Sequence, residues 1–509
     1  MARTVATPSI PLSTIRVAPA RLESPAAREG ARVVSSVVLV LLSLYAVAYI
    51  GRVIGLTLYP FDLDQGEGYD VNSGWLLTQG RSIYTSNEEW PYYSSNYPPV
   101  FSVMLTPLIT MLGPTLAAGR LLSATAALLT ALLIGVAVIR ERGTIIAAAI
   151  AGLLYLASPY VYHTTPLARV NALAELFSLA GVILCFSRGR AAYACGAVLL
   201  AVAVFTKPTA APVLAAAFGY GLITRPRFAV PVMVVTGMAG LLVLAALERI
   251  SGGAFWLNTV QGNINPWGWG QATSYWTNFS LIHAGLIGVV LLAGRRSASN
   301  RYWLYALACL PTVIGVGKWG AGESYFLGLI VALCVLVGSA LSALSIRPTG
   351  LLVASLTLLV QCGLYLHEPF TRTVGLSADL GIQFEALGTT PRADDALPGW
   401  DLITILDDNP GPVLAEDATY ALLSGREIVG NATHLRNLHA SGHWQGERLL
   451  ADIEARRFNW IVLDAQLYPE PVLQTIGHTY YLYEVVQHRG VEQWIFAPGA
   501  DPDAQEESP

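Results

Sequence analysis

Long runs of apolar residues recur along the chain, and they constrain its fold more than any other feature. A helix needs about 20 apolar residues to cross a bilayer, and somewhat fewer where flanking side chains reach the interface. Only 13% of the 509 residues are charged, whereas soluble domains are about 25% charged. The sequence therefore predicts an α-helical polytopic membrane protein with about eleven transmembrane helices, near Val33–Leu58, Leu121–Ile139, Thr144–Tyr160, Val170–Phe186, Ala191–Phe205, Pro208–Ile223, Phe228–Ala246, Leu281–Ala293, Tyr302–Val316, Tyr325–Leu344 and Gly350–Leu366.

Arginine clusters predict how this transmembrane domain, residues 33–367, is oriented. Cytoplasmic loops carry an excess of Lys and Arg. If the short apolar run Val100–Leu112 does not cross, five clusters share a side with the basic N-terminal segment: Arg140/Arg142, Arg188/Arg190, Arg225/Arg227, Arg295/Arg296/Arg301 and Arg347. We therefore expect Val100–Leu112 to be an interfacial helix on the outer surface. Residues 1–32 are expected to form a disordered cytoplasmic tail of a protein of a bacterial-type plasma membrane.

The segment after His367 is more polar and contains no apolar run long enough to span. Its pattern predicts strands at residues 411–415 and 459–464, short helices at 417–424 and 446–457, and a hairpin from 480–486 and 492–497. We expect residues 368–500 to form a small extracytoplasmic α/β domain. Residues 501–509 are expected to form an acidic, disordered tail.

Between the first two predicted spans, within the outer loop 60–98, lies an unusually acidic segment. It holds four carboxylates in nine residues, Asp62, Asp64, Glu67 and Asp70, and a glycine flanks Glu67 on either side. Carboxylates are costly near hydrocarbon, and glycines let a backbone turn sharply beside a ligand. The segment is therefore either the catalytic loop of a membrane glycosyltransferase or a solvated acidic loop that caps a helix.

The other ingredients of glycosyl transfer from a lipid carrier fall on the same predicted face. The acceptor hydroxyl needs a carboxylate base, which Asp64 or Glu67 would supply. The leaving phosphate needs cations, and the outer helix ends carry Arg120, Arg169, Lys207 and Lys318. The loop Phe255–Phe279 supplies aromatic faces for a sugar. Each of these cations could instead reach to lipid headgroups, and each tryptophan could belong to an interfacial belt.

Several other classes of function are not indicated. A net charge of −4 argues against nucleic-acid binding. The chain has no phosphate-binding glycine loop, zinc motif or serine nucleophile elbow, which speaks against the chemistry of soluble nucleotide-sugar enzymes. The five cysteines lie in apolar runs, so no disulfide framework is implied. His163 and His283 lie near outer helix ends, but no metal-ligand spacing is visible, and a divalent cation stays an open alternative.

Several motifs, in this order, resemble those of the GT-C superfamily of polytopic glycosyltransferases, in particular bacterial relatives of the protein O-mannosyltransferases and the lipid A aminoarabinose transferase. The resemblance covers most of residues 33–345, and it is carried by Asp64-Gln65-Gly66-Glu67-Gly68-Tyr69, Leu77-Thr78-Gln79-Gly80-Arg81-Ser82-Ile83-Tyr84, Asn96-Tyr97-Pro98-Pro99, Ala118-Gly119-Arg120-Leu121-Leu122-Ser123, Ala168-Arg169-Val170-Asn171, Phe205-Thr206-Lys207-Pro208-Thr209 and Lys318-Trp319-Gly320-Ala321-Gly322-Glu323-Ser324-Tyr325-Phe326.

The resemblance implies a polyprenyl-phosphate sugar donor and a base in the first outer loop. It points to Asp64 first and Glu67 second, although the family often has an adjacent Asp-Glu pair and these two are separated by Gln65-Gly66. Asn171 stands where the family has an Asp, and it cannot act as a base. Expected phosphate ligands are Arg169, Lys207 and Lys318, with Arg120 as a further candidate; expected substrate contacts are Tyr69, Tyr97, Glu323, Tyr325, Trp267 and Trp269.

The sequence thus favours an inverting membrane glycosyltransferase that acts on a glycan, lipid or protein acceptor outside the cytoplasm. A transporter or flippase of lipid-linked sugars would share the cations and aromatics. Transporters usually carry internal repeats, and none is visible here. A non-catalytic polysaccharide-binding membrane protein would keep the fold without needing Asp64.

Overall fold

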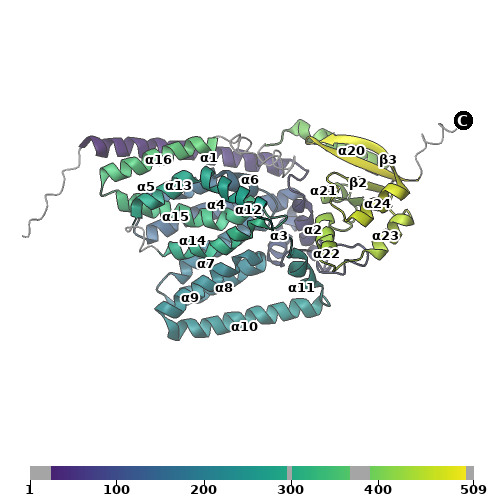
Figure 1. The fold of residues 1–509 in the computed structure, drawn as a ribbon, viewed down its shortest axis with the longest axis horizontal. Coiled ribbons are helices and arrows are strands. Elements are labelled where there is room, and N and C mark those ends of the chain that lie inside the picture. The colour runs from purple at the N-terminus through teal and green to yellow at the C-terminus, as the bar shows by residue number, and fades with distance from the viewer. Residues whose placement is uncertain (1–24, 295–300, 367–389, 500–509) are drawn as a thin grey trace, which may run out of the picture.

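The computed structural model describes residues 25–294, 301–366 and 390–499. They form a bundle of helices with a small sheet-containing domain at one end (Figure 1). The predicted acidic tail, most of the predicted N-terminal tail and the first part of the predicted C-terminal domain lie outside the described residues.

Every predicted apolar run is helical. The first helix begins earlier than expected, at Pro25. The helices of the bundle are α1 Pro25–Leu58, α2 Gly66–Thr78, α3 Val100–Leu112, α4 Leu116–Arg140, α5 Ile145–Ala157, α6 Pro159–Thr164, α7 Asn171–Cys185, α8 Arg190–Thr206, α9 Ala211–Thr224, α10 Pro226–Ile250, α11 Ala254–Thr259, α12 Trp269–Ile282, α13 Ala284–Ala293, α14 Tyr302–Ile314, α15 Leu327–Leu344 and α16 Pro348–Leu366. Short 3₁₀ turns join several of them: η1 Pro208–Ala210, η2 Gln261–Asn263, η4 Gly315–Gly317 and η5 Glu323–Phe326.

Among the described residues, five helical stretches are long and apolar enough to cross a bilayer, which makes the chain a multi-pass membrane protein. They are α1, α4, α10, η5 with α15, and α16; α12 and α13 together make a sixth candidate that is bent by 66°. The stretch of α15 is 78% buried, whereas only 6% of the stretch of α10 is buried. α15 is therefore the core of the bundle, and α10 lies at its edge (Figure 1). The count of eleven spans, and the interfacial role of α3, stay predictions.

Three described arginines of the predicted basic clusters lie at one end of the bundle. Arg140 ends α4 and donates to Ser187 Oγ at 3.0 Å. Arg225 donates to the carbonyl of Cys185, and Arg301 pairs with Glu141. The acidic segment lies at the opposite end, since Glu67 contacts Arg120 near the start of α4.

The C-terminal domain is an α/β domain, as expected. Its sheet has the order β1-β2-β4-β3, with β1 parallel to β2 and the other neighbours antiparallel. The predicted hairpin is confirmed, and it turns at Arg489-Gly490, which have φ of 58° and 76° as a two-residue hairpin turn requires. The elements are η6 Ala393–Ala396, α20 Leu397–Asp408, β1 Val413–Ala415, α21 Ala418–Leu423, α22 Ala432–Ala440, α23 Glu447–Glu454, β2 Trp460–Leu463, α24 Glu470–Thr479, β3 Tyr480–His488 and β4 Val491–Pro498.

Buried apolar residues join the bundle to this domain. Tyr59 and Phe61, which precede the acidic segment, share one buried cluster with Leu402 and Tyr420 of the domain. The ring of Phe61 stands edge-on to that of His488, with centroids 4.8 Å apart. The start of the acidic segment is therefore enclosed between the bundle and the C-terminal domain.

Candidate active site

Asp64 stands at the start of α2 and has one free carboxylate oxygen. Its Oδ1 accepts a hydrogen bond from the backbone N–H of Gly66 at 2.9 Å and lies 3.5 Å from Nε of Arg169. Its Oδ2 has no hydrogen-bond partner among the described residues, and the side chain is 39% exposed. The start of a helix favours a negative charge, and one oxygen of the Asp64 carboxylate is open to a ligand.

Glu67, one turn further along, is placed differently. Its side chain is fully buried, and Arg120 binds it with two hydrogen bonds of 2.8 Å. The backbone N–H groups of Leu63 and Ala168 donate to the same carboxylate. Burial alone would raise the pKa of Glu67, but the charge and hydrogen bonds of Arg120 hold it below its usual value.

Arg120 completes this buried pair. Besides Glu67, its guanidinium donates to the backbone carbonyls of Leu56, Tyr59 and Phe61. Neither Arg120 nor Glu67 belongs to the walls of the polar cavity and the apolar cavity described below. The pair therefore ties α2 and α4 to the end of α1, and it has no hydrogen-bonding capacity left for a substrate.

Arg169 connects the acidic segment to the loop before α7. Its Nη1 lies 3.4 Å from Asp70 Oδ2, and its guanidinium lies 5.7 Å from the ring centre of Tyr97. Burial raises the pKa of Asp70 to about 7, against the lowering effect of Arg169. Arg169 fits here because Gly66 has no side chain: the guanidinium occupies the space that a Cβ would need.

These residues open on a polar cavity of about 450 Å³. Asp64 and Glu323 are the carboxylates on its wall, and Arg169, Lys207 and Lys318 are the cations. Carboxamides from six segments line the rest of it: Gln65, Asn96, Asn171, Asn263, Asn265, Gln271, Asn431 and Asn437. Amide, hydroxyl and aromatic groups of this kind suit a ligand rich in hydroxyls.

A second, more apolar cavity of about 530 Å³ adjoins the first. It is lined by Pro208, Pro212, Val260, Ile264, Trp267 and Pro311. Lys207, Lys318, Tyr97 and Tyr325 belong to the walls of both cavities. Two lysines therefore stand where the polar cavity meets the apolar one.

Both lysines are held by polar partners. Lys207 Nζ donates to Asn171 Oδ1 at 2.7 Å and lies 4.9 Å from the ring centre of Tyr325. Lys318 Nζ donates to the carbonyl of Asn263 at 3.0 Å. Asn171, the departure from the family motif, thus serves to orient Lys207.

The other predicted substrate contacts are only partly brought together. Tyr69, Tyr97, Glu323 and Tyr325 all line the polar cavity, and Glu323 pairs with His163 at 3.1 Å. Trp267 lines the apolar cavity only, and Trp269 is 70% exposed and lines neither.

The C-terminal domain contributes part of the wall, which sequence reasoning missed. Asn431, Thr433, Asn437 and Leu467 line the polar cavity. Asn431 also caps α22, since its side chain accepts from the N–H of His434. The polar residues around Asn431 were the only signal in the sequence, and nothing local distinguishes them from an ordinary helix cap.

The cavity does not offer a set of metal ligands. In the described ranges no three His, Cys, Asp or Glu side chains converge as ligands. The carboxylates on the wall are already paired, Asp64 with Arg169 and Glu323 with His163.

Comparisons with known proteins place this architecture. No protein-family model matches the chain, and no curated protein matches it. The crystal structure of ArnT from Cupriavidus metallidurans bound to undecaprenyl phosphate superposes with a TM-score of 0.61 at 15% identity, over 90% of this chain and 98% of that one. The oligosaccharyltransferase of Archaeoglobus fulgidus in its apo form gives a TM-score of 0.51 at 12% identity, over 88% of this chain and 73% of that one.

The chain has a GT-C fold. The resemblance that the sequence motifs suggested is thereby confirmed at the level of the fold. The GT-C fold here includes the C-terminal domain as well as the bundle, because the likeness to ArnT extends over 90% of this chain.

Proposed function

We propose that this protein transfers a sugar from a polyprenyl-phosphate-linked donor to a hydroxyl group of an extracytoplasmic acceptor. The acceptor is a glycan, lipid or protein of the cell envelope, and the membrane is of the bacterial plasma-membrane type, with the N-terminus in the cytoplasm. One observation carries the proposal: a polar cavity with an open carboxylate joins an apolar cavity at two lysines. This arrangement suits an amphiphile whose sugar, phosphate and hydrocarbon each meet a matching wall.

The chemistry of the proposed step follows from the carboxylate and the lysines on the wall of the polar cavity. Asp64 takes the proton of the acceptor hydroxyl through its open Oδ2. The hydroxyl oxygen forms its bond to the anomeric carbon as the bond from that carbon to the phosphate oxygen breaks on the opposite face, which inverts the configuration. The polyprenyl phosphate leaves as an anion, and Lys207 and Lys318 stabilise its charge.

The remaining cavity residues bind and orient. Arg169 forms an ion pair with Asp64. It also lines the polar cavity with Lys207 and Lys318 and would share in binding the phosphate. Tyr69, Tyr97, Tyr325 and Glu323 would contact the sugar or the acceptor. Trp267 belongs to the apolar cavity and would contact the hydrocarbon chain, a class of ligand that the ArnT structure holds as undecaprenyl phosphate.

We assign Glu67 and Arg120 to support of the site. Glu67 has no free oxygen, since Arg120 and two backbone N–H groups occupy its carboxylate. Arg120 is equally engaged with Glu67 and three carbonyls. We therefore propose Asp64 alone as the base.

The test compares Asp64→Asn with Asp401→Asn, a matched change at an exposed position of α20. Each full-length protein is purified in lipid, and radiolabelled polyprenyl-phosphate sugars are supplied with an envelope extract. Asp64→Asn should lower transfer by 100-fold or more, because general-base catalysis contributes roughly 10²–10⁴-fold. Donor binding should persist in Asp64→Asn, and Asp401→Asn should match the wild type in both measurements.

Two results would contradict the proposal. Full transfer by Asp64→Asn would show that another group is the base. Movement of the labelled lipid across vesicles by a wild type that never transfers sugar would show a transporter instead.

A further inference from the structure

The C-terminal domain holds the acidic segment on either side of Asp64. On one side, Nη1 of Arg489 lies 2.9 Å from Oδ1 of Asp62. On the other side, Nε2 of Gln65 donates to the backbone carbonyl of Glu416 at 3.1 Å. Asp64 thus lies between two residues that another domain holds in place.

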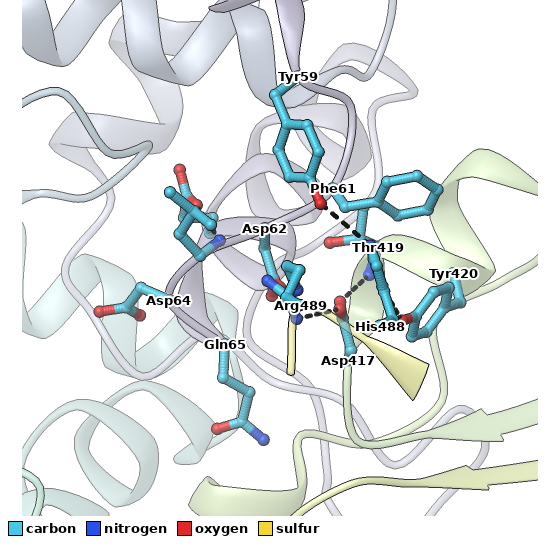
Figure 2. Close-up of polar contacts among 12 residues, drawn as sticks. Tyr59, Phe61, Asp62, Asp64, Gln65, Asp417, Thr419, Tyr420, His488 and Arg489 are labelled. Atoms are coloured by element: carbon cyan, nitrogen blue, oxygen red, sulfur yellow. Dashed lines mark hydrogen bonds and ion pairs between the residues drawn. The ribbon is translucent and has the colours of Figure 1, made fainter. Parts of the chain in front are cut away.

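Arg489 reaches the segment from the tip of the β3–β4 hairpin. Its guanidinium lies between Asp62 and Asp417, whose Oδ2 is 3.6 Å from Nη2 (Figure 2). Both carboxylates are 2% exposed. Burial raises the pKa of Asp62, the charge of Asp417 raises it further, and Arg489 opposes both effects. Without Arg489, two buried carboxylates would face each other with no cation, which is strongly unfavourable.

Glu416 is itself held rigidly, which fixes the second contact of the domain, the one with Gln65. Its carboxylate accepts hydrogen bonds from the backbone N–H groups of five consecutive residues: Asp464, Ala465, Gln466, Leu467 and Tyr468. Its backbone carbonyl is therefore fixed, and it accepts from Tyr69 Oη at 3.0 Å as well as from Gln65. The hydroxyl of Thr433 donates to Oε1 of the same Gln65 side chain.

Hydrogen bonds of the neighbouring His488 support the contact between Arg489 and Asp62. His488, which precedes Arg489, bonds Tyr59 through Nε2 at 3.0 Å and Tyr420 through Nδ1 at 2.7 Å (Figure 2). Tyr59 belongs to the bundle and Tyr420 to the domain. The hairpin tip is thus joined to the chain on both sides of the interface, and Arg489 has little freedom to move.

We propose that the C-terminal domain is a positioning part of the catalytic site, in which Arg489 orients Asp64 through Asp62. This inference rests on the proposed role of Asp64 as base. Arg489 and Asp62 lie outside the wall of the polar cavity, so Arg489 is a positioning residue. Misplacement of a reacting group by about 1 Å can cost roughly 100-fold in rate, and the loss should therefore fall on kcat.

The test compares Arg489→Met with Arg426→Met in the full-length protein. Arg426 is a matched control because its side chain is 11% exposed, against 14% for Arg489, and it pairs with Asp407 inside the same domain. Arg489→Met should lower kcat by roughly 10- to 100-fold with KM for the donor nearly unchanged, and Arg489→Lys should restore part of it. Arg426→Met should leave kcat within about threefold. An equal loss in Arg489→Met and Arg426→Met would overturn the inference.

Hydrogen exchange separates this inference from the proposed function, because it needs no substrate. Amides of residues 62–69 should exchange faster in Arg489→Met than in the wild type or Arg426→Met, while those of β2 should not change. Unchanged exchange at residues 62–69 would overturn the inference even if transfer fell. If the wild type transfers no sugar, the proposed function is refuted. Faster exchange at residues 62–69 in Arg489→Met would then still show that Arg489 holds the acidic segment in place.

A second pair of variants covers the case in which Arg489→Met fails to fold. Asp62→Asn keeps the shape of the side chain and removes the charge that Arg489 binds, and Asp407→Asn does the same for Arg426. Asp62→Asn should lower kcat and speed exchange at residues 62–69, whereas Asp407→Asn should do neither. Wild-type kcat and exchange in Asp62→Asn would overturn the inference.

Discussion

Gly66 illustrates how a single residue shapes the candidate site. A Cβ at this position would lie 1.1 Å from Nη1 of Arg169. The clash falls on the far end of a flexible side chain, so the guanidinium would move and the backbone would not. The sequence suggested that this glycine lets the backbone turn beside a ligand, and the structure shows that it is required for close packing against a cation.

Gly66→Ala should lower transfer at least tenfold while the protein stays folded. The displaced Arg169 would release Asp64 and Asp70, with which it forms ion pairs. Transfer and thermal unfolding should be measured beside Gly477→Ala, because a Cβ at Gly477 meets nothing within 4 Å. A Gly66→Ala protein as active as Gly477→Ala would show that Arg169 does not set the geometry of Asp64.

Asp70 should make stability depend on pH. Its pKa is about 7 in the folded protein because of burial, against about 3.9 in an unfolded chain. The folded state therefore binds the proton more tightly, and this contribution to stability is full below about pH 4 and is lost as the pH rises through about 7. The melting temperature of the wild type should fall over this range.

Asp70→Asn should remove part of that fall, since an amide does not titrate. Thermal unfolding from pH 4 to pH 8 would measure it, with the exposed Asp401→Asn as the control that keeps the wild-type slope. Parallel curves for the wild type and Asp70→Asn would contradict the assignment.

At the scale of elements, the buried pair of Glu67 and Arg120 joins α2, α4 and the end of α1. Loss of one partner from a buried ion pair costs about 3–5 kcal/mol, since the other charge is left without compensation. Glu67→Gln should thus destabilise the protein by several kcal/mol in a denaturant titration. Glu454→Gln at the exposed end of α23 should change stability by less than about 0.5 kcal/mol. A mild effect of Glu67→Gln would mean that α2 is held mainly by its apolar contacts.

The elements that could be predicted from the sequence are those that depend on local pattern. Apolar runs marked the helices of the bundle, and the patterns of residues 480–486 and 492–497 marked the hairpin. Sequence could not separate Asp64 from Glu67, because the two differ only in partners that lie far away in the chain. Arg120 and Ala168 bind Glu67 from positions 53 and 101 residues away. The contribution of Thr433 to the cavity was missed for the same reason, since Thr433 contacts Gln65, a residue 368 positions away in the sequence.

At the scale of the whole molecule, the polar cavity lies between the bundle and the C-terminal domain, and the apolar cavity that adjoins it is lined by the bundle. The bundle supplies the lysines and the apolar wall, and the domain supplies Asn431, Thr433 and Asn437. The GT-C fold thus accounts for the general placement of the site. The pairing of Arg489 with Asp62 is a property of this chain's own residues, and it joins positions 427 residues apart that no local sequence pattern connects.

The span of sequence between Asp62 and Arg489 has a consequence for biogenesis. The two residues are 427 positions apart, and a ribosome adds roughly 5–20 residues per second. The acidic segment is therefore synthesised on the order of a minute before Arg489, the residue that binds Asp62. During that interval the nascent protein already has its acidic segment but not the hairpin that orients it, so we expect an incomplete chain to transfer sugar more slowly than the finished protein.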